Sequence, residues 1–517
     1  MEPAEVMALN SLASSSSASS SSASGPSHLW KKLRSDWLIL AEEESTYPQD
    51  LWTANVQMRM SQLEDAVSSL GALAEAAPIV LIAEPEPQQF LCALWAALRA
   101  GWTIALANPD WGQQEWRSVS ATICPTLVWG KAVPDHLCSH RDLAASAGVD
   151  GAVAQILIPT GGTSGKIKFV HHTWQTLLAA VEGFCQHFAP SHAVDSYCVL
   201  PLYHVSGLMQ VLRSLISGGQ LAIAPFKYIE SIEPNSPLPF SARSSLTAIS
   251  LVPTQLHRLL ESNKSSWLKQ FDIVFLGGAP AWPDLIEAAH TAQIPLSLSY
   301  GMTETAAMVT ALAPEDFWSG DRTSGKPLPH AALTILNSEP NSEPDSEPNS
   351  EQPLPPGQTG RISIQSASIP RALSPSQTLL TDDLGYFDMS GHLHITGRAS
   401  QTIISGGENI SPTEVEAAIR STGQVKDVCV FALPDAQWGE AVSAAYVPAH
   451  EAVTAHALQQ ALRSPSAARD QQGTPPILSR YKHPKHWLAL EAMPRNAQGK
   501  LNRQALITQA QRSLLSS

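Results

Sequence analysis

The sequence predicts an α/β protein, with a large N-terminal domain of sheets flanked by helices and a small α+β domain at the C-terminal end. Short apolar runs such as Ile79–Ala83 and Thr103–Ala107 alternate with helical stretches such as Gln88–Ala100, which is typical of a parallel sheet. After Arg398–Ser400 the pattern changes to a glycine-rich segment, a helix, two strands and a second helical stretch. We therefore place a domain boundary at Arg398–Ser400.

Composition excludes several classes of protein. The chain has 517 residues, 44% of them hydrophobic and 15% charged, which is enough to build a sizeable core. A formal net charge of −14 disfavours nonspecific binding to nucleic acid or to a membrane surface. The apolar run that comes nearest to membrane-spanning length, Leu91–Ala107, contains Arg99, so we expect no membrane span.

The six cysteines form no C-x-x-C pair, which argues against a zinc site or a disulfide framework and favours a reducing, cytoplasmic location. We expect small-molecule partners. The oligomeric state stays open, with a homodimer as one option.

Three segments have compositions that cannot bury a core. Residues 1–28 form a serine-rich tail that we expect to be disordered. A transit peptide is the alternative, but Glu2 and Glu5 are present and no arginine precedes Arg34. A four-residue repeat, NSEP-NSEP-DSEP-NSEQ, occupies 337–352 and predicts a disordered insert, with an interaction tether as the alternative. Residues 464–476 predict a surface loop. The predicted domains are then 29–398 and 399–517.

A glycine- and hydroxyl-rich loop, Ile158–Val170, lies between a predicted strand, Gln155–Ile158, and a predicted helix, His171–Phe188. Its glycines allow close approach of a polyanion, and its hydroxyls and lysines supply donors and charge. It is not a Walker loop, because only three residues separate Gly161 from Gly165 and Ile167 follows the lysine. An ordinary turn is the alternative to a phosphate-binding loop. The residues expected to bind phosphate are Thr160, Gly161, Gly162, Thr163, Ser164, Gly165 and Lys166.

Four further apolar runs end in small or polar residues. His204 follows the first of them, and the carboxyl ends of strands in open α/β sheets bind ligands, so we expect a pocket role for it rather than that of a helix-end histidine. The runs are Tyr197–Leu200 before PLYHVSG, Leu246–Val252, Asp272–Leu276 before GGAP, and Leu296–Ser299 before YGMTET.

Beyond the insert, alternating residues in 381–398 around Ser390-Gly391 predict a hairpin. The segment ISGGENISPTEVE then opens a helix with a predicted capping box, in which Ser411 caps and Glu414 is third. Strands at Val428–Ala432 and Val442–Val447 and a helix from His456 complete the small unit.

Eight motifs in order, from residue 160 to 500, resemble those of the adenylate-forming enzymes, which include acyl-CoA synthetases, luciferases and peptide-synthetase adenylation domains. Within that superfamily, ILIPTGGTSG with PLYHVSGLMQVLRS looks most like the 2-succinylbenzoate-CoA ligases of menaquinone and phylloquinone biosynthesis, particularly cyanobacterial ones. The motifs are TGGTSGKIK, PLYHVSG, GGAP, YGMTET, TDDLG, the GR of 397–398, SGGENISPTEVE and PRNAQGK.

The resemblance implies ATP, Mg²⁺ and coenzyme A as reactants or cofactor, and a C-terminal domain that rotates between two half-reactions. This sequence departs from the family at Ile167 and Phe169, where proline and glycine are usual, and at the hinge residue Ser400, which is often aspartate. Local loop geometry and ease of rotation are the features these departures affect.

The resemblance also implies roles for individual residues. Asp383 accepts the ribose hydroxyls, Arg398 braces the sugar, and Glu304 binds magnesium, with a helix N-terminal carboxylate as the alternative for Glu304. Lys500 bridges the substrate carboxylate and α-phosphate, so Lys500, Glu304 and His204 are the expected catalytic residues. Residues that complete the ATP site are Gly278, Ala279, Tyr300, Gly301 and Thr303, and those that line a CoA tunnel are Gly406, Gly407 and Glu408.

Succinylbenzoate has a second carboxylate, which needs a cation if it is buried. Arg213 lies nine residues after His204, or about 13 Å along a helix, so it would reach the distal end of the acid; a solvent-facing arginine is the alternative. With His204 and Ser206 it forms the expected substrate site. The leading hypothesis is therefore an ATP-dependent acyl-CoA ligase. The alternatives are a ligase for another aryl or fatty acid, a stand-alone enzyme that loads a carrier protein, and a pseudoenzyme that senses ATP.

Overall fold

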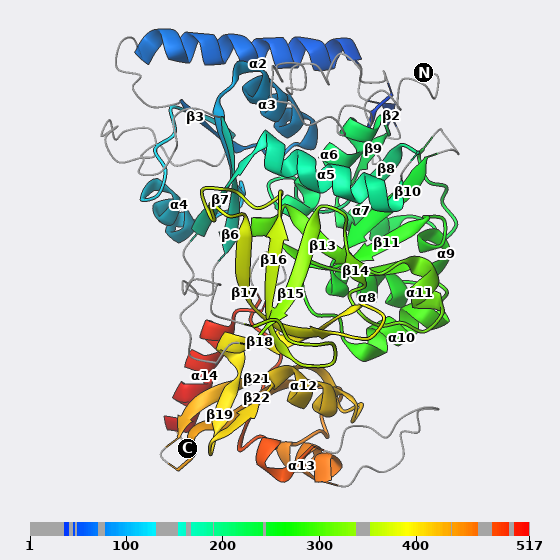
Figure 1. Ribbon diagram of the computed structural model, residues 1–517, viewed down its shortest axis with the longest axis vertical. Coiled ribbons are helices and arrows are strands. Elements are labelled where there is room, and N and C mark those ends of the chain that lie inside the picture. Colours follow the sequence, from blue (N-terminus) through cyan, green and yellow to red (C-terminus); the bar gives the residue numbers. More distant parts are fainter. Residues whose placement is uncertain are drawn as a thin grey trace.

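The computed structural model describes residues 36–40, 45–46, 49–70, 78–130, 154–161, 167–189, 191–240, 245–337, 352–435, 437–463, 478–495 and 501–515. It has mixed α/β architecture, with a large N-terminal part of three sheets and a smaller C-terminal part around a fourth (Figure 1). The predicted fold class is confirmed. The predicted tail and most of the predicted insert and loop, 1–28, 338–351 and 464–477, lie outside the described residues.

The largest sheet has nine strands, and its central strands are parallel. Each of the four predicted apolar runs overlaps a strand of this sheet, and the first strand begins and ends earlier than predicted, at Val194–Cys198. The fourth, however, continues as a strand through Met302, so that Tyr300 and Gly301 belong to the sheet. In spatial order the strands are β14 (Lys326–Pro327), β13 (Ala307–Ala311), β12 (Leu296–Met302), β11 (Ile273–Leu276), β10 (Leu246–Leu251), β8 (Val194–Cys198), β9 (Leu221–Ile223), β1 (Leu38–Leu40) and β2 (Ser45–Thr46).

The second sheet has five strands and carries the predicted phosphate loop. Its last two strands, β6 and β7, form an antiparallel hairpin around that loop. The prediction of a helix over His171–Phe188 is wrong in its first three residues, because 167–173 return as strand β7 and the helix begins only after the N-cap Thr173. In spatial order the strands are β5 (Leu127–Gly130), β3 (Ile79–Ala83), β4 (Thr103–Leu106), β6 (Gln155–Gly161) and β7 (Ile167–Thr173).

Helices pack on both faces of these two sheets (Figure 1). The main core joins α3, α5 and α6 to strands of both sheets, through residues such as Trp95, Leu177 and Leu208. None of the helices in the described part of the chain is long and apolar enough to cross a bilayer. The helices are α2 (Gln49–Leu70), α3 (Pro87–Ala100), α4 (Gln113–Ser120), α5 (Trp174–Phe188), α6 (Val205–Ser217), α7 (Phe226–Ser231), α8 (Pro253–Glu261), α9 (Ser265–Leu268), α10 (Pro283–Thr291), α11 (Pro314–Trp318) and the 3-10 turn η6 (Thr303–Thr305).

A four-stranded antiparallel sheet follows, and its last two strands are the hairpin predicted over 381–398. The strands are β15 (Ala331–Leu336), β16 (Gly360–Ser366), β17 (Thr378–Phe387) and β18 (Leu393–Arg398). The 3-10 turn η8 (Ala399–Gln401) leads from it into the C-terminal part.

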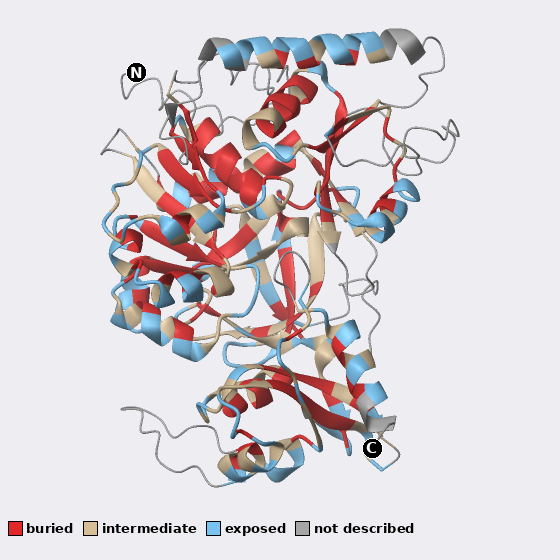
Figure 2. Cartoon of the chain, turned by 180° about the vertical axis from the view of Figure 1, so that it is seen from behind, coloured by how far each residue is buried: buried red, intermediate tan, exposed pale blue. Residues whose placement is uncertain are grey.

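The C-terminal part has its own core, in which α12 and α13 pack against a five-stranded sheet (Figure 2). The predicted strands and helices are present, and both strands are longer than expected. The predicted capping box is wrong, because the Ser411 side chain makes no capping hydrogen bond and Glu414 pairs with Lys482 instead. The elements are β19 (Ile403–Ser405), β20 (Glu408–Ile410), α12 (Pro412–Arg420), β21 (Val425–Asp435), β22 (Gly439–Pro448), α13 (Ala455–Arg463), η9 (Arg480–Lys482), β23 (His486–Ala489) and α14 (Arg503–Leu515).

Candidate active site

Asp383 is the centre of a polar cluster formed where the nine-stranded and four-stranded sheets meet. The Tyr300 hydroxyl donates to Asp383 Oδ2 at 2.8 Å, and Arg398 Nε donates to Oδ1 at 2.9 Å. Asp383 and Arg398 are register partners on β17 and β18. Asp383 is buried, with 7% of the residue exposed. Because each carboxylate oxygen accepts one of these hydrogen bonds, both oxygens are held in fixed directions. A buried carboxylate oriented in this way is suited to accept hydrogen bonds from a diol.

Burial and the adjacent Asp383 charge raise the pKa of Tyr300, so its phenol stays protonated and remains a donor. The Arg398 side chain is about half exposed at 49%, so its ion pair with Asp383 contributes little to stability. The ion pair instead orients the Asp383 carboxylate and leaves part of the Arg398 guanidinium accessible to solvent.

Other residues predicted for the nucleotide, Gly278, Ala279, Gly301 and Thr303, belong to or follow β11 and β12, which are neighbouring strands. Gly278 and Ala279 are exposed and directly follow β11, which is the neighbour of β12. Gly278 has φ +80°, a conformation that favours glycine. At Gly301, beside a register shift in the sheet, a Cβ would lie 2.0 Å from the Ala307 carbonyl oxygen, so no side chain fits. At Gly301, therefore, backbone lies directly against backbone.

Glu304 lies in the 3-10 turn η6, which is followed by residues with unusual backbone geometry. The next residues, Ala306 and Ala307, have φ of 52° and 81°, and Thr305 Oγ1 closes the turn with Met302 and Ala307 carbonyls. Strain of this kind persists where the surrounding structure holds it, often at ligand sites. The turn is a three-residue 3-10 segment rather than the start of an α-helix, so the helix-dipole alternative for Glu304 is not supported.

Within the described residues, the half-buried Glu304 carboxylate has no hydrogen-bond or ion-pair partner. The same residues contain no group of three or more His, Cys, Asp or Glu side chains that could hold a metal ion. One available carboxylate fits Mg²⁺, which proteins usually bind through one or two carboxylates together with phosphates and water.

His172 connects the phosphate-loop hairpin to this turn. Its Nε2 donates to the Thr303 carbonyl at 2.7 Å, and its Nδ1 lies 3.0 Å from Thr176 Oγ1. Burial lowers the pKa of His172 to about 4, outweighing the bond to Thr303. The sequence analysis missed this residue, and no local pattern pointed to it.

The loop itself is described only at its ends. Thr160 and Gly161 are strand residues paired with Lys168 and Ile167. Ile167 and Phe169, the two departures from the family pattern, extend the hairpin as strand residues. The predicted phosphate ligands Gly162, Thr163, Ser164, Gly165 and Lys166 lie outside the described residues.

The predicted substrate residues all belong to the start or body of α6. His204 is the N-cap position, with its ring 4.6 Å from that of Tyr203, and Ser206 is exposed. Arg213 is 4% exposed, so the alternative of a solvent-facing arginine is wrong. Its guanidinium lies 4.1 Å from the centre of the Phe184 ring on α5.

Arg213 is a buried cation that lies against the Phe184 ring. Among the described residues, its guanidinium has no hydrogen-bond or ion-pair partner. Burial lowers its pKa to about 10, and the neighbouring Cys185 opposes that shift. His330, which the sequence analysis missed, has its pKa lowered to about 4 by burial and by the Arg213 charge. An uncompensated buried charge is costly, so this environment favours an anion beside Arg213.

The predicted CoA residues lie at the β19–β20 hairpin, where Gly406 and Gly407 form the turn and Glu408 begins β20. Gly406 and Gly407 have φ of 61° and 86°, and both are exposed, as is Glu408. The Trp438 side chain packs against Gly406, where an added Cβ would lie 3.0 Å from it. Lys485 Nζ lies 4.4 Å from the Trp438 ring centre, which adds a cation and an aromatic ring to the same surface.

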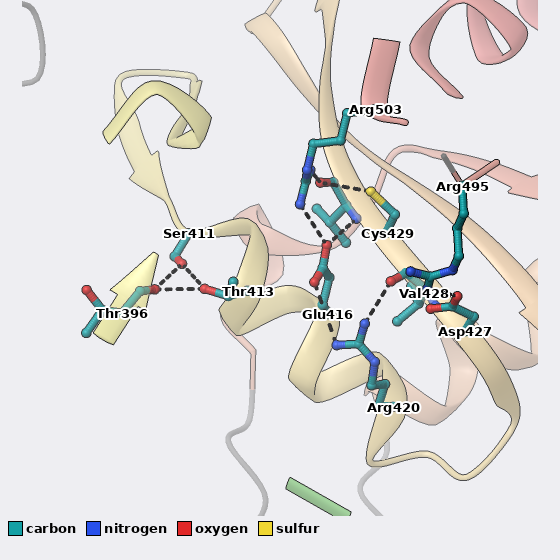
Figure 3. Close-up of polar contacts among 11 residues, drawn as sticks. Thr396, Ser411, Thr413, Glu416, Arg420, Asp427, Val428, Cys429, Arg495 and Arg503 are labelled. Carbon is teal, nitrogen blue, oxygen red and sulfur yellow. Dashed lines mark hydrogen bonds and ion pairs between the residues drawn. The ribbon is translucent and has the colours of Figure 1, made fainter. Parts of the chain in front are cut away.

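Lys500 lies outside the described residues, which stop at Arg495 and resume at Leu501. Both flanks are anchored (Figure 3). Arg495 pairs with Asp427 at 2.6 Å, and Arg495 and Leu501 form an antiparallel bridge. Arg503 donates to the Val430 carbonyl at 2.8 Å.

Arg503 also pairs with Glu416 at 3.5 Å, and Glu416 in turn accepts from the Val430 amide at 2.8 Å. Burial raises the pKa of Glu416 although Arg420 and Arg503 oppose the shift. The two ends of the Lys500 segment are thus tied to β21 and α12.

Comparison of the sequence with known protein families assigns the chain to a class of enzymes. Residues 54–372 match the AMP-binding enzyme family and residues 414–500 match the AMP-binding enzyme C-terminal domain. The chain belongs to the AMP-binding enzyme family.

Particular relatives are the 2-succinylbenzoate-CoA ligases. The ligase of Listeria monocytogenes is 31% identical over 67% of this chain and 68% of its own length. Among solved structures, o-succinylbenzoate CoA synthetase from Bacillus subtilis with its acyl-adenylate intermediate is 25% identical, covering 92% of this chain and 97% of that chain, with a TM-score of 0.71.

The Bacillus protein has been solved in other complexes as well. With ATP and a magnesium ion it is 25% identical, covers 91% of this chain and 96% of its own, and gives a TM-score of 0.68. A double mutant of it bound to a product analogue is 26% identical, covers 92% of this chain and 97% of its own, and gives a TM-score of 0.57.

Proposed function

We propose that this chain is an ATP-dependent ligase that converts 2-succinylbenzoate and CoA to 2-succinylbenzoyl-CoA, AMP and diphosphate, in menaquinone or phylloquinone biosynthesis. The relatives support the reaction, and the Tyr300–Asp383–Arg398 cluster supports nucleotide binding. The observation that supports this choice of acid is the burial of the Arg213 guanidinium, which a second carboxylate of the substrate would pair with.

The first half-reaction must overcome the poor reactivity of a carboxylate. An oxygen of the succinyl carboxylate attacks the α-phosphorus of ATP, and diphosphate leaves. Asp383, held by Tyr300 and Arg398, orients the ribose. Lys500 stabilises the negative charge that develops between carboxylate and phosphate, an effect worth about 10²-fold to 10³-fold in rate. Glu304 would hold Mg²⁺, which would supply positive charge against the phosphates.

In the second half-reaction the CoA thiol attacks the acyl carbon, the bond to AMP breaks, and the thiol proton is lost to a base. Gly406, Gly407 and Glu408 line the approach of the thiol, since glycine allows backbone to lie close to a pantetheine chain. His204, at the N-cap position of α6, is the remaining residue that we assign to catalysis.

Arg213 holds the aromatic carboxylate. Its place within α6, beyond His204 and Ser206, keeps that carboxylate away from ATP while the succinyl carboxylate reacts. The contact would satisfy a guanidinium whose neighbours in the described part of the chain include the Phe184 ring, Cys185 and His330 but no carboxylate paired with it.

We further propose the boundary between a 29–398 domain and a rotating 399–517 domain, at the point where η8 joins two separate sheets. A cytoplasmic location is consistent with the free thiols Cys92, Cys124, Cys185, Cys198 and Cys429. A homodimer stays an expectation for size-exclusion chromatography with light scattering to check.

ATP–pyrophosphate exchange with a panel of aromatic and fatty acids, followed by a test of CoA dependence, examines the function. We expect 2-succinylbenzoate to support exchange best and CoA to be required for AMP release. Exchange with another acid alone would overturn the substrate, and exchange without CoA-dependent turnover would indicate carrier loading. Absence of exchange with every acid would indicate a nucleotide sensor.

A further inference from the structure

The turn that links the two parts of the chain is held by one carboxylate. Asp382 Oδ1 accepts from the Ser400 amide at 3.0 Å, and Asp382 Oδ2 accepts from the Ser400 hydroxyl at 2.5 Å. Ser400 is the middle residue of η8 (Ala399–Gln401). Both oxygens of the carboxylate therefore engage the same residue of the link. We refer to these two hydrogen bonds as the Asp382–Ser400 clasp.

The clasp is adjacent to the nucleotide cluster. Asp382 and Asp383 are consecutive residues of β17, and side chains of consecutive strand residues point to opposite faces. One carboxylate receives Tyr300 and Arg398, and the other receives Ser400. A single strand thus fixes the nucleotide site and the link between the two parts of the molecule.

A second set of contacts joins the same two parts. The Ser411 and Thr413 hydroxyls, at the start of α12, lie 3.2 and 2.8 Å from the Thr396 carbonyl oxygen on β18 (Figure 3). These contacts are between neutral groups. Hydrogen bonds to an ionised carboxylate are roughly twice as strong as neutral ones, but the clasp is exposed to solvent and the Thr396 contacts are partly buried, so both sets restrain this arrangement.

The structure that contains the clasp is not equally similar to all solved complexes of the Bacillus protein. The TM-score is 0.71 with the acyl-adenylate complex and 0.57 with the product-analogue complex of the double mutant, at the same coverage of 92% of this chain. The structure as a whole is thus more similar to the adenylate complex than to the product-analogue complex.

We propose that the Asp382–Ser400 clasp holds the C-terminal part in the orientation that forms the acyl-adenylate, and that it opens before the thioester step. Asp382 is then a positioning residue for the first half-reaction, acting through Ser400 rather than on substrate. This inference rests on the proposed function, since it needs two half-reactions that use different orientations.

Three substitutions separate the two hydrogen bonds. Ser400→Ala removes the hydroxyl bond and keeps the amide bond, Asp382→Ala removes both, and Asp382→Asn keeps the shape but loses the charge. Ser390→Ala, an exposed serine at the opposite end of the same hairpin, is the matched control. Each variant is assayed for ATP–pyrophosphate exchange, for thioester formation from supplied acyl-adenylate and CoA, and for melting temperature.

We expect exchange to fall about threefold in Ser400→Ala and about tenfold in Asp382→Ala, as for loss of one and two charge-assisted bonds on a partly exposed surface. Thioester formation should be unchanged or faster, and Asp382→Asn should lie between wild type and Asp382→Ala. Trypsin should cut after the adjacent Arg398 faster in Ser400→Ala, which reports the link directly.

Equal losses in both half-reactions, or no loss in either, would overturn the clasp while leaving the ligase function intact. Absence of exchange in the wild type with every acid would overturn the proposed function and the clasp with it. If the wild type uses an acid other than 2-succinylbenzoate, the same variants are compared with that acid.

Discussion

His172 donates a hydrogen bond from Nε2 to the carbonyl of Thr303 at 2.7 Å, across 131 residues of sequence. This contact fastens strand β7, which returns from the predicted phosphate loop, to the turn that carries Glu304. Strand β7 and the turn that carries Glu304 are therefore fixed relative to each other by this buried histidine.

Replacing His172 should change how stability depends on pH. The pKa of the buried ring is lowered to about 4 from the ordinary 6.5, so the neutral ring is favoured in the fold. Its contribution is complete above pH 6.5 and is lost as the pH falls from 6.5 towards 4, by up to about 3 kcal/mol. Chemical denaturation at several pH values should show a smaller loss of unfolding free energy over that range in His172→Gln than in wild type.

At pH 7.5 the same variant should be less stable by about 1 to 3 kcal/mol, because a flexible glutamine amide replaces a buried ring that is hydrogen-bonded through both nitrogens, to Thr303 and to Thr176. His456→Gln, an exposed histidine on α13, is the control and should leave the pH slope unchanged. An unaltered slope in His172→Gln would contradict the assignment.

Arg213→Ala should raise the KM for 2-succinylbenzoate about tenfold or more and change the KM for ATP little. The reason is loss of a charge-assisted contact of about 1.5 to 3 kcal/mol to the aromatic carboxylate. Steady-state kinetics with each substrate varied in turn measure this. Arg258→Ala, on the exposed surface of α8, is the matched arginine control. An unchanged substrate KM would remove Arg213 from the pocket.

Lys500→Ala should abolish adenylation and spare thioester formation from supplied acyl-adenylate, because the lysine acts only on the developing charge of the first step. Pyrophosphate exchange and a direct thioester assay separate the two steps. Comparable loss in both would contradict this role.

Arg495→Ala should give a weaker form of the same split. It frees one end of the Lys500 segment from Asp427 without removing the lysine. Exchanging the two charges, with Asp427→Arg and Arg495→Asp in one protein, should restore part of the lost exchange if the ion pair is what matters. The pair is partly exposed, so neither variant should lower the melting temperature by more than a few degrees.

Replacing residues 338–351 with a short Gly-Ser link should leave melting temperature and turnover nearly unchanged. The structure places the two ends together, with the Asn337 amide donating to the Gln352 carbonyl at 3.3 Å and Leu336 bridging to Pro353. A short link can therefore close the gap without strain. A drop of many degrees on calorimetry would show that the repeat packs on the molecule.

Much of the fold could be predicted from local pattern. The apolar runs, the helix over Gln88–Ala100 and the hairpin around Ser390-Gly391 are confirmed within a few residues. These elements can be predicted from hydrophobic periodicity and turn residues, which are local signals over about ten residues. The errors lie where a distant partner competes with a local one. Ser411 bonds to Thr396 on another strand instead of capping its own helix, and residues 167–173 pair with β6 instead of entering the helix.

By itself, then, the sequence determined the α/β class, the order of motifs and the family, because those depend on residue types and spacings along the chain. Tertiary structure decided that Asp383 is hydrogen-bonded to Tyr300 and Arg398, that Arg213 is buried with no hydrogen-bond partner for its Nε among the described residues, and that Asp382 binds Ser400. Each of these depends on how sheets and helices pack across long separations. Burial and the direction of a side chain are set by that packing, and no local run of residues encodes them.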